Sequence, residues 1–307
     1  MSFMFAEKKS VLFVLGACLL WAIDLLVRYP VTLKLGYVHI IFLESLLAFL
    51  FVTPWLFKNS KKVCSAFSKQ TILLFVFLGG VGMTIAGYLS TVSIQQATPG
   101  TFSFFQMFQP IIVICLAHLF LREKFENMYI YWGLWVMLSA VLMYSQDLEL
   151  MFTNESGINL PGVFIAFGTT IIWGLCTVAA KKLLQTQTPM ALVAFRAIFA
   201  FLFAGVFLIF QKEAIPWDLL IEWEFIWRFV FMGPVAGVLS MYLYYSGMKN
   251  MALGKVSFIE LSFPAFGMTL SALYTFEQLT ILQTLGAASF FIFIAILFFA
   301  PSSLRKS

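Results

Sequence analysis

Ten long runs of apolar residues, separated by short polar stretches, take up almost the whole chain. A helix of about 20 apolar residues is long enough to cross the ~30 Å hydrocarbon layer of a bilayer. The runs therefore predict an all-α integral membrane protein with ten transmembrane helices and no separate domain outside the membrane. The predicted helices cover residues 10–29, 37–57, 70–94, 99–121, 128–146, 160–184, 189–211, 225–248, 255–276 and 280–301.

The composition excludes a water-soluble protein. Of the 307 residues, 62% are hydrophobic and 11% are charged, whereas a soluble domain is roughly 45–50% apolar and about 25% charged. Lys8 and Lys9 precede the first apolar run as in a signal peptide, but the run has no small-x-small cleavage pattern, so we interpret it as a transmembrane helix. The four cysteines form no C-x-x-C pair, and the sequence predicts neither a metal site nor a cofactor.

The basic residues predict the orientation of the chain. With a cytoplasmic N-terminus, fourteen of the 19 Lys and Arg residues fall at the cytoplasmic ends of the helices, three fall on the opposite side, and two lie within helices. This asymmetry is the one expected from the positive-inside rule. We therefore expect a multi-pass protein of a cell membrane, with a bacterial inner membrane favoured, and with both termini in the cytoplasm. The same asymmetry accounts for the net charge of +5 without a nucleic acid as partner.

The two halves of the chain repeat one another. Residues 19–51 align with residues 171–203 without a gap, so that Trp21 matches Trp173 and both copies contain AFLF. Each copy holds five predicted helices, an odd number, so the second copy must be inverted in the membrane relative to the first. We place the first repeat at 1–150 and the second, inverted repeat at 151–307. At a slightly larger spacing of 154, the matching pairs are Tyr88 and Tyr242, Gly100 and Gly254, Ser103 and Ser257, Pro110 and Pro264, and Glu123 and Glu277.

This doubled pattern is similar to that of the drug/metabolite transporter superfamily, and specifically to its ten-helix EamA-like branch. The resemblance is carried by Trp173-Gly174, by Arg196 within AFRAIFAFLF, and by the run Gly100–Glu123 with its copy Gly254–Glu277. It implies a proton-coupled or facilitative carrier of small metabolites, with a central cavity lined by the first, third, fourth, sixth, eighth and ninth helices. Inverted repeats of this kind hold the substrate near the membrane midplane.

Four acids and bases stand out inside the predicted helices, namely Asp24, Arg28, Glu44 and Arg196, with Glu260 as a fifth candidate. A charge at the bilayer centre costs at least ~2.5–3.5 kcal/mol, so each should face protein or a water-filled cavity. Glu44 and Arg196 occupy the same slot of the two repeats, where the family commonly carries a basic residue in both copies. They form either an ion pair or separate helix contacts, or else an internal gate or proton-linked switch.

Asp24 has two interpretations. It can pair with Arg28 four residues later on the same helical face, while Arg28 extends toward the membrane surface. Alternatively, it faces the central cavity and binds a substrate cation or carries a coupling proton. The repeat favours the second interpretation, because the matching positions, Cys176 and Ala180, are neutral. The family also more often has a small or amide residue in place of Asp24.

Further candidates for the substrate-binding site are polar or aromatic residues near the predicted midplane. An aromatic face close to carboxylates suits a cationic group, although the same residues could serve only packing. The predicted substrate-binding set is Asp24, Trp21, Glu44, Tyr88, Gln106, Gln109, Trp173, Arg196, Tyr242, Tyr245 and Glu260. Glycines at 79–82 and the Gly233/Gly237 pair predict close helix contacts, and Pro110 and Pro264 predict kinks.

We therefore predict a secondary active transporter that moves a small polar metabolite by alternating access. The acids favour an amine-bearing substrate, such as an amino acid or an amino-acid-containing compound like S-adenosylmethionine. Alternatives are an exporter of cationic drugs or quaternary amines, a carrier of nucleotide precursors, or, from another class, a membrane-embedded enzyme or a channel. The expected partners are the small-molecule substrate and the bilayer. A coupling proton, and the choice between monomer and homodimer, are left open.

Overall fold

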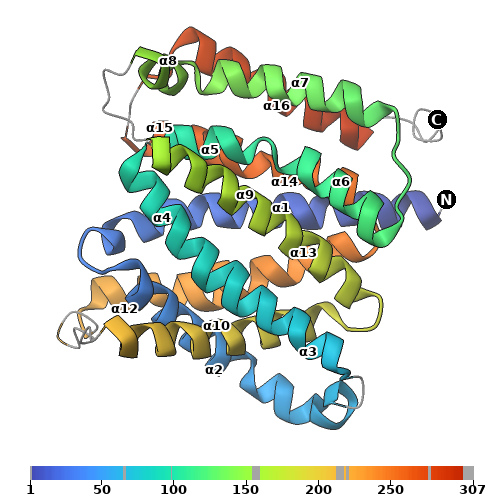
Figure 1. Ribbon diagram of the computed structural model, residues 1–307, viewed down its shortest axis with the longest axis vertical. Helices are drawn as coiled ribbons and strands as arrows, with labels where there is room; N and C mark the ends of the chain where they lie inside the picture. The colour runs from blue at the N-terminus through green and yellow to red at the C-terminus, as the bar shows by residue number, and fades with distance from the viewer. Residues whose placement is uncertain are drawn as a thin grey trace.

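The computed structural model describes residues 2–64, 67–97, 99–153, 160–211, 218, 221–275 and 278–299. These residues are almost entirely helical. Within them, nine helices are long and apolar enough to span a membrane, and a tenth, Met128–Met143, is apolar but shorter. The predicted all-α fold with ten transmembrane helices is confirmed. The first helix begins and the last helix ends at the same end of the bundle (Figure 1), which we call the terminal end.

The ten spans are built from more segments than the sequence predicts, because several spans are interrupted. In the first half the segments are α1 (Ser2–Thr32), α2 (Tyr37–Cys64), α3 (Lys69–Val76), η1 (Phe77–Ile85), α4 (Ala86–Gln96), α5 (Pro99–Gln106), α6 (Gln109–Leu121), α7 (Met128–Met143) and α8 (Ser145–Thr153). In the second half they are α9 (Leu160–Leu184), α10 (Pro189–Gln211), α12 (Trp223–Val230), η2 (Phe231–Leu239), α13 (Ser240–Lys249), α14 (Leu253–Glu260), α15 (Ser262–Thr275) and α16 (Ile281–Phe299).

The interruptions recur at the spacing of the sequence repeat. The π-helical segments η1 and η2 are 154 residues apart, and so are the last residues of α5 and α14. The fourth and ninth spans break just before Pro110 and Pro264, which lie in the first turns of α6 and α15. Proline lacks the N–H that would continue the preceding helix. The predicted kinks are thus breaks, and π-helical segments and discontinuous helices are frequent at functional sites.

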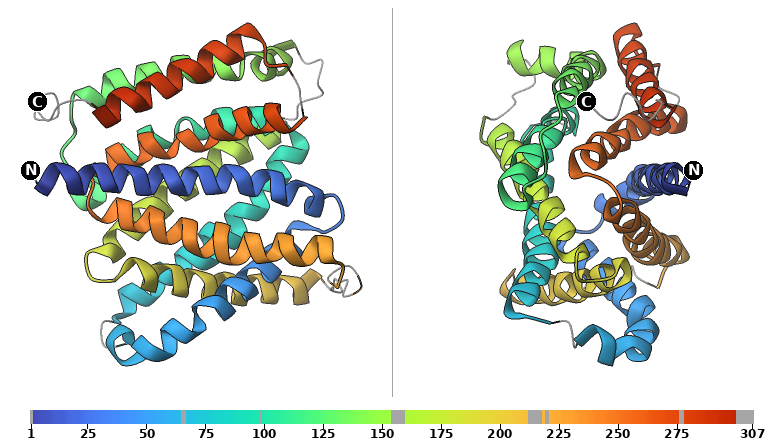
Figure 2. Two further views of the ribbon diagram at one scale, coloured as in Figure 1. Left: turned by 180° about the vertical axis from the view of Figure 1, so that it is seen from behind. Right: turned by 90° about the vertical axis from the view of Figure 1, so that its right-hand side faces the viewer.

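The principal helix contacts join the two halves. Helix α1 packs against α13 and α15, and its counterpart α9 packs against α4 and α6. Helix α2 packs on α10, while α7 and α16 lie side by side along one edge of the bundle (Figures 1 and 2). Side chains of the first, third, fourth, sixth, eighth and ninth spans therefore meet between the halves.

Two equivalent glycines bring the π-helical segments against the helices that carry Glu44 and Arg196. A Cβ atom at Gly79 would lie 2.7 Å from the Arg196 carbonyl oxygen and 2.6 Å from the Phe199 Cβ. At Gly233 it would lie 3.0 Å from the Glu44 carbonyl oxygen. Only a residue without a side chain permits this approach, which confirms the predicted close contacts at these two positions.

We expect Gly79→Ala to lower the thermal unfolding temperature by several degrees, because overpacking at a tight contact costs about 1–3 kcal/mol. Gly168→Ala is the matched control, since a Cβ there meets nothing within 4 Å and alanine favours the helix. Thermal unfolding in detergent measures both. Equal unfolding temperatures for the two variants would contradict the close-contact role.

Candidate substrate and ion site

The buried charges of α1 and α2 form a single cluster. Arg28 Nη2 lies 2.7 Å from Asp24 Oδ2 and 2.6 Å from Glu44 Oε2, and Arg28 Nε donates a further hydrogen bond of 2.8 Å to Asp24 Oδ2. Asp24 and Glu44 are only 8% and 5% exposed. The Asp24–Arg28 pair is therefore formed. Arg28 is held inward by two acids rather than extended to the membrane surface, and Glu44 pairs with Arg28 instead of Arg196.

Arg196, on α10, is an unpaired cation inside the protein. Within the described residues its guanidinium makes no hydrogen bond or ion pair, although the charge of Glu44 is close enough to interact with it. Arg196 lines a closed cavity of about 10 Å³ together with Glu44 and Ser45. That volume holds about one water molecule. The Ser45 hydroxyl is fully buried and has no hydrogen-bond partner.

Glu260, at the break between α14 and α15, is the centre of a second polar cluster. Its carboxylate accepts a hydrogen bond of 2.8 Å from the Tyr244 hydroxyl and another from the Gln109 side chain. Tyr244 also hydrogen-bonds Thr177. The cluster thereby links α6, α9, α13 and α14, which places Glu260 where the two halves meet.

Aromatic rings border this second cluster. The Trp21 ring lies 5.2 Å from that of Tyr244 and 6.3 Å from that of Phe263, and Trp21 Nε1 donates to Ser240 at 2.8 Å. Tyr245 is buried, and its ring lies 5.6 Å from that of Tyr244. Aromatic side chains therefore surround the Tyr244 hydroxyl that binds Glu260.

The remaining predicted residues are distributed differently. Gln106 is buried at the end of α5, in the slot that matches Glu260. Trp173 Nε1 donates to the Gly82 carbonyl at 3.2 Å, and Tyr88 packs on Phe207. Tyr242 is 42% exposed and makes none of the contacts of the two clusters.

Three members of these clusters are absent from the predicted binding set: Thr177, Tyr244 and Arg28, which the sequence singles out as a partner of Asp24. The sequence does not single out Thr177, because a lone threonine in an apolar helix carries no pattern that indicates a binding role. Tyr244 belongs to a run of three tyrosines within residues 242–245. The sequence repeat pairs only Tyr242 with a tyrosine of the first half, Tyr88, and so points to Tyr242. In the structure, the rotation of α13 instead buries Tyr244 and Tyr245.

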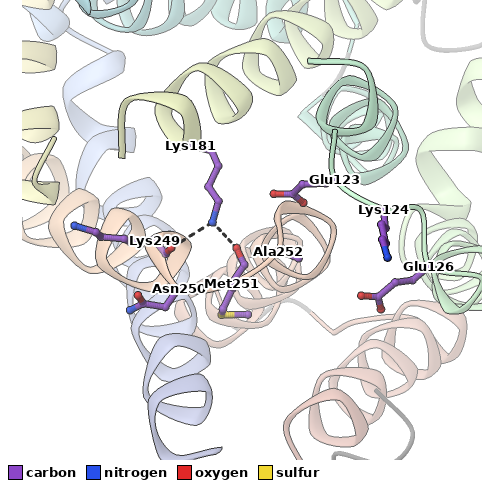
Figure 3. A pocket seen from close by; sticks show the side chains of 8 residues that line it. All are labelled: Glu123, Lys124, Glu126, Lys181, Lys249, Asn250, Met251 and Ala252. Atoms are coloured by element: carbon purple, nitrogen blue, oxygen red, sulfur yellow. Dashed lines mark hydrogen bonds between the residues drawn. The ribbon is translucent and has the colours of Figure 1, made fainter. Parts of the chain in front are cut away.

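A pocket of about 440 Å³ opens at the terminal end, between α6, α9 and the turn from α13 to α14 (Figure 3). The Lys181 ammonium donates to the carbonyls of Met248 and Met251 at 2.7 and 2.6 Å. From the other half, Glu123 Oε2 accepts a hydrogen bond of 2.9 Å from the Leu253 amide. The first repeat has Tyr29 and Pro99 at the positions of Lys181 and Leu253, so it cannot build the same contact at the opposite end.

We expect Lys181→Met to lower the thermal unfolding temperature by several degrees, because hydrogen bonds to a charged group contribute about 1.5–3 kcal/mol each. Lys182→Met is the control, since Lys182 is exposed on the same helix. The two unfolding temperatures should differ clearly in detergent. If they agree, the contacts of Lys181 do not hold the α13–α14 turn.

Known transporters are similar to this chain in sequence, and a solved structure is similar to it in fold. A curated riboflavin transporter, ImpX of Fusobacterium nucleatum, is 24% identical over 286 residues, covering 91% of this chain and 94% of that protein. The uncharacterised transporter YetK of Bacillus subtilis is 22% identical and covers 85% of this chain and 76% of its own length. A solved structure titled only as a protein crystal structure superposes with a TM-score of 0.74 over 97% of this chain, at 13% identity, which shows the fold alone.

The family match itself covers both halves of the chain. The EamA-like transporter family matches residues 8–145 and again residues 160–299, and the resemblance seen in the sequence is confirmed. Family and relatives point to a transporter rather than an enzyme. The chain is a multi-pass membrane transporter and belongs to the EamA-like transporter family.

Proposed function

We propose that this protein is a secondary active transporter for a small polar metabolite that carries both an amine and a carboxylate. The observation that supports the proposal most is Glu260, a carboxylate at the break between α14 and α15 that is bound by the neutral Tyr244 hydroxyl at 2.8 Å, together with Arg196, which forms no ion pair within the described residues. An arginine without an ion pair suits a carboxylate, which it can bind with two parallel hydrogen bonds. A substrate amine would lie against Glu260.

The contacts of the acids narrow the position of the amine. Asp24 and Glu44 are both engaged by Arg28, so a substrate amine would have to compete with a guanidinium there. Glu260 is held only by neutral partners, Tyr244 and Gln109. The neighbouring rings of Trp21 and Tyr244 add cation–π attraction. We therefore assign the amine to Glu260 rather than to Asp24.

Alternating access supplies the transport cycle. The cavity beside Arg196 holds about 10 Å³, far less than a metabolite needs, so the protein must open around Arg196 to admit a substrate. The broken spans and the contacts of α1 and α9 across the halves give the protein matching elements that can exchange roles. We propose 1–150 and 151–307 as the two inverted repeats that do so.

The distribution of basic residues supports a cytoplasmic location for the terminal end. Lys124, Lys181 and Lys249 surround the pocket in Figure 3, as the positive-inside rule expects of a cytoplasmic surface. We propose the cell membrane of a bacterium as the location. The 440 Å³ pocket would then be a cytoplasmic vestibule.

A flat aromatic metabolite is a second candidate substrate. One relative is named a riboflavin transporter, and the rings of Trp21, Tyr244 and Phe263 offer a surface for a planar ring system. Such a substrate would depend on these aromatic residues and would tolerate the loss of the Glu260 charge.

A thermal-shift panel with the purified chain distinguishes the candidates. It contains lysine and methionine, S-adenosylmethionine, choline and spermidine, uridine, and riboflavin. Ligand at 100 times its Kd stabilises a protein by about 2.7 kcal/mol. We expect stabilisation by compounds with both an amine and a carboxylate. Stabilisation by riboflavin or uridine alone would select the second candidate, and no stabilisation by any amine would contradict the first.

For the stabilising compound, we expect Glu260→Gln and Arg196→Gln each to weaken binding about 10- to 100-fold, because a charge-assisted hydrogen bond contributes about 1.5–3 kcal/mol. Glu224→Gln is the control. Glu224 is an exposed acid paired with Arg228, and its variant should bind as the wild type does. Uptake by proteoliposomes and isothermal calorimetry measure the effect. Unchanged affinity in both test variants would exclude the assigned site.

A further inference from the structure

The cluster of Asp24, Arg28 and Glu44 has an unbalanced charge. One Nη2 atom of Arg28 contacts both carboxylates, at 2.7 and 2.6 Å. Two acids and one base leave one negative charge in excess when all three are ionised. Both acids are at least nine-tenths buried, and an uncompensated charge in a low-dielectric interior is costly.

The hydrogen bonding of the cluster is incomplete in the same place. Asp24 Oδ1 is buried and has no hydrogen-bond partner, so this carboxylate oxygen has lost its water without replacement. A proton on one of the two acids would remove the excess charge. Two carboxylates that share one site commonly hold a single proton between them for this reason.

The surrounding groups that the structure describes supply the missing positive charge only in part. From α2, Tyr37 contributes a neutral hydroxyl that donates to the Met83 carbonyl at 3.2 Å. From α12, Arg228 is engaged by the Val27 carbonyl and by Glu224. From α10, Arg196 lies near Glu44 but forms no ion pair with it, and both line the small closed cavity.

We infer that Asp24 and Glu44 together bind one proton, taken from solvent onto a carboxylate oxygen, at a site distinct from the Glu260 cluster. The second repeat has Cys176, Ala180 and Arg196 in the slots of Asp24, Arg28 and Glu44. Its neutral pair shows that the architecture is built without such a cluster. The excess acid therefore serves proton binding rather than helix packing.

Arg196 connects this site to the substrate, a step that rests on the proposed function. While Arg196 is free, its charge partly offsets that of Glu44. A substrate carboxylate bound to Arg196 cancels that charge, so Glu44 and Asp24 hold the proton more firmly. Proton and substrate then bind cooperatively, and by linkage each raises the affinity for the other. The proton is thus the coupling ion.

Infrared difference spectroscopy of the full chain in proteoliposomes tests the proton site without any substrate. A protonated carboxyl group gives a C=O band that disappears as it ionises with rising pH. We expect such a band in the wild type above about pH 6, where exposed carboxyl groups are already ionised. Its intensity should fall by one carboxyl group in Asp24→Asn and also in Glu44→Gln, because one remaining acid and Arg28 form a balanced ion pair.

Glu260→Gln is the matched control, since it removes a buried acid from the other cluster and should keep the band. The wild type together with this control already decides the question if a cluster variant does not fold. No titrating carboxyl band, or a band lost only in Glu260→Gln, overturns the inference. A band of wild-type intensity in either folded cluster variant overturns it as well.

A separate measurement tests the coupling of proton binding to substrate uptake. It uses whichever compound of the thermal-shift panel binds. An inward proton gradient should accelerate its uptake at least tenfold in the wild type and have no effect in Asp24→Asn. Equal gradient effects in the two proteins overturn the coupling. If no compound binds, the proposed substrate class fails, while the infrared result still decides the proton site.

Discussion

Hydrocarbon offers neither a hydrogen-bond partner nor a counter-ion, so each polar group of this chain must find its partner within the protein. The backbone meets this constraint by forming helices. Where the ninth span breaks, the freed groups have protein partners: Ser262 and Cys18 donate hydrogen bonds to the carbonyls of Ile259 and Glu260. The irregular backbone is therefore confined to the contact between the halves, where it can shape a binding site.

The same constraint explains the grouping of the charges. Arg28 alone would be costly in the membrane, and so would Asp24 or Glu44. With Arg28 within 2.7 Å of each acid, the three charges become tolerable, although one negative charge remains in excess. Among the described residues, Arg196 and Glu260 have no such partner of opposite charge. A transporter can use buried charges that lack a counter-charge, because the binding of substrate or proton supplies the missing charge.

Features that recur in both halves form the shared architecture of the protein, whereas features found in one half alone serve its specific function. The π-helical segments, the breaks and the close contacts of Gly79 and Gly233 recur in both halves. The charge cluster does not recur, and neither do the contacts of Lys181 and Glu123 at the terminal end. Alternating access needs the shared elements, whereas selectivity and coupling need the differences.

The sequence by itself determined the ten helices, the repeat and the identity of the membrane-embedded charges, because hydrophobicity and spacing are properties of the linear chain. The family also followed from those repeated motifs. Only the tertiary structure decided which charges pair, since that depends on how each helix is rotated and where it crosses its neighbours. Arg28 thus binds Glu44 from another helix as well as Asp24 from its own. The rotation of α13 turns Tyr245 inward and leaves Tyr242 exposed, a difference that no spacing rule predicts.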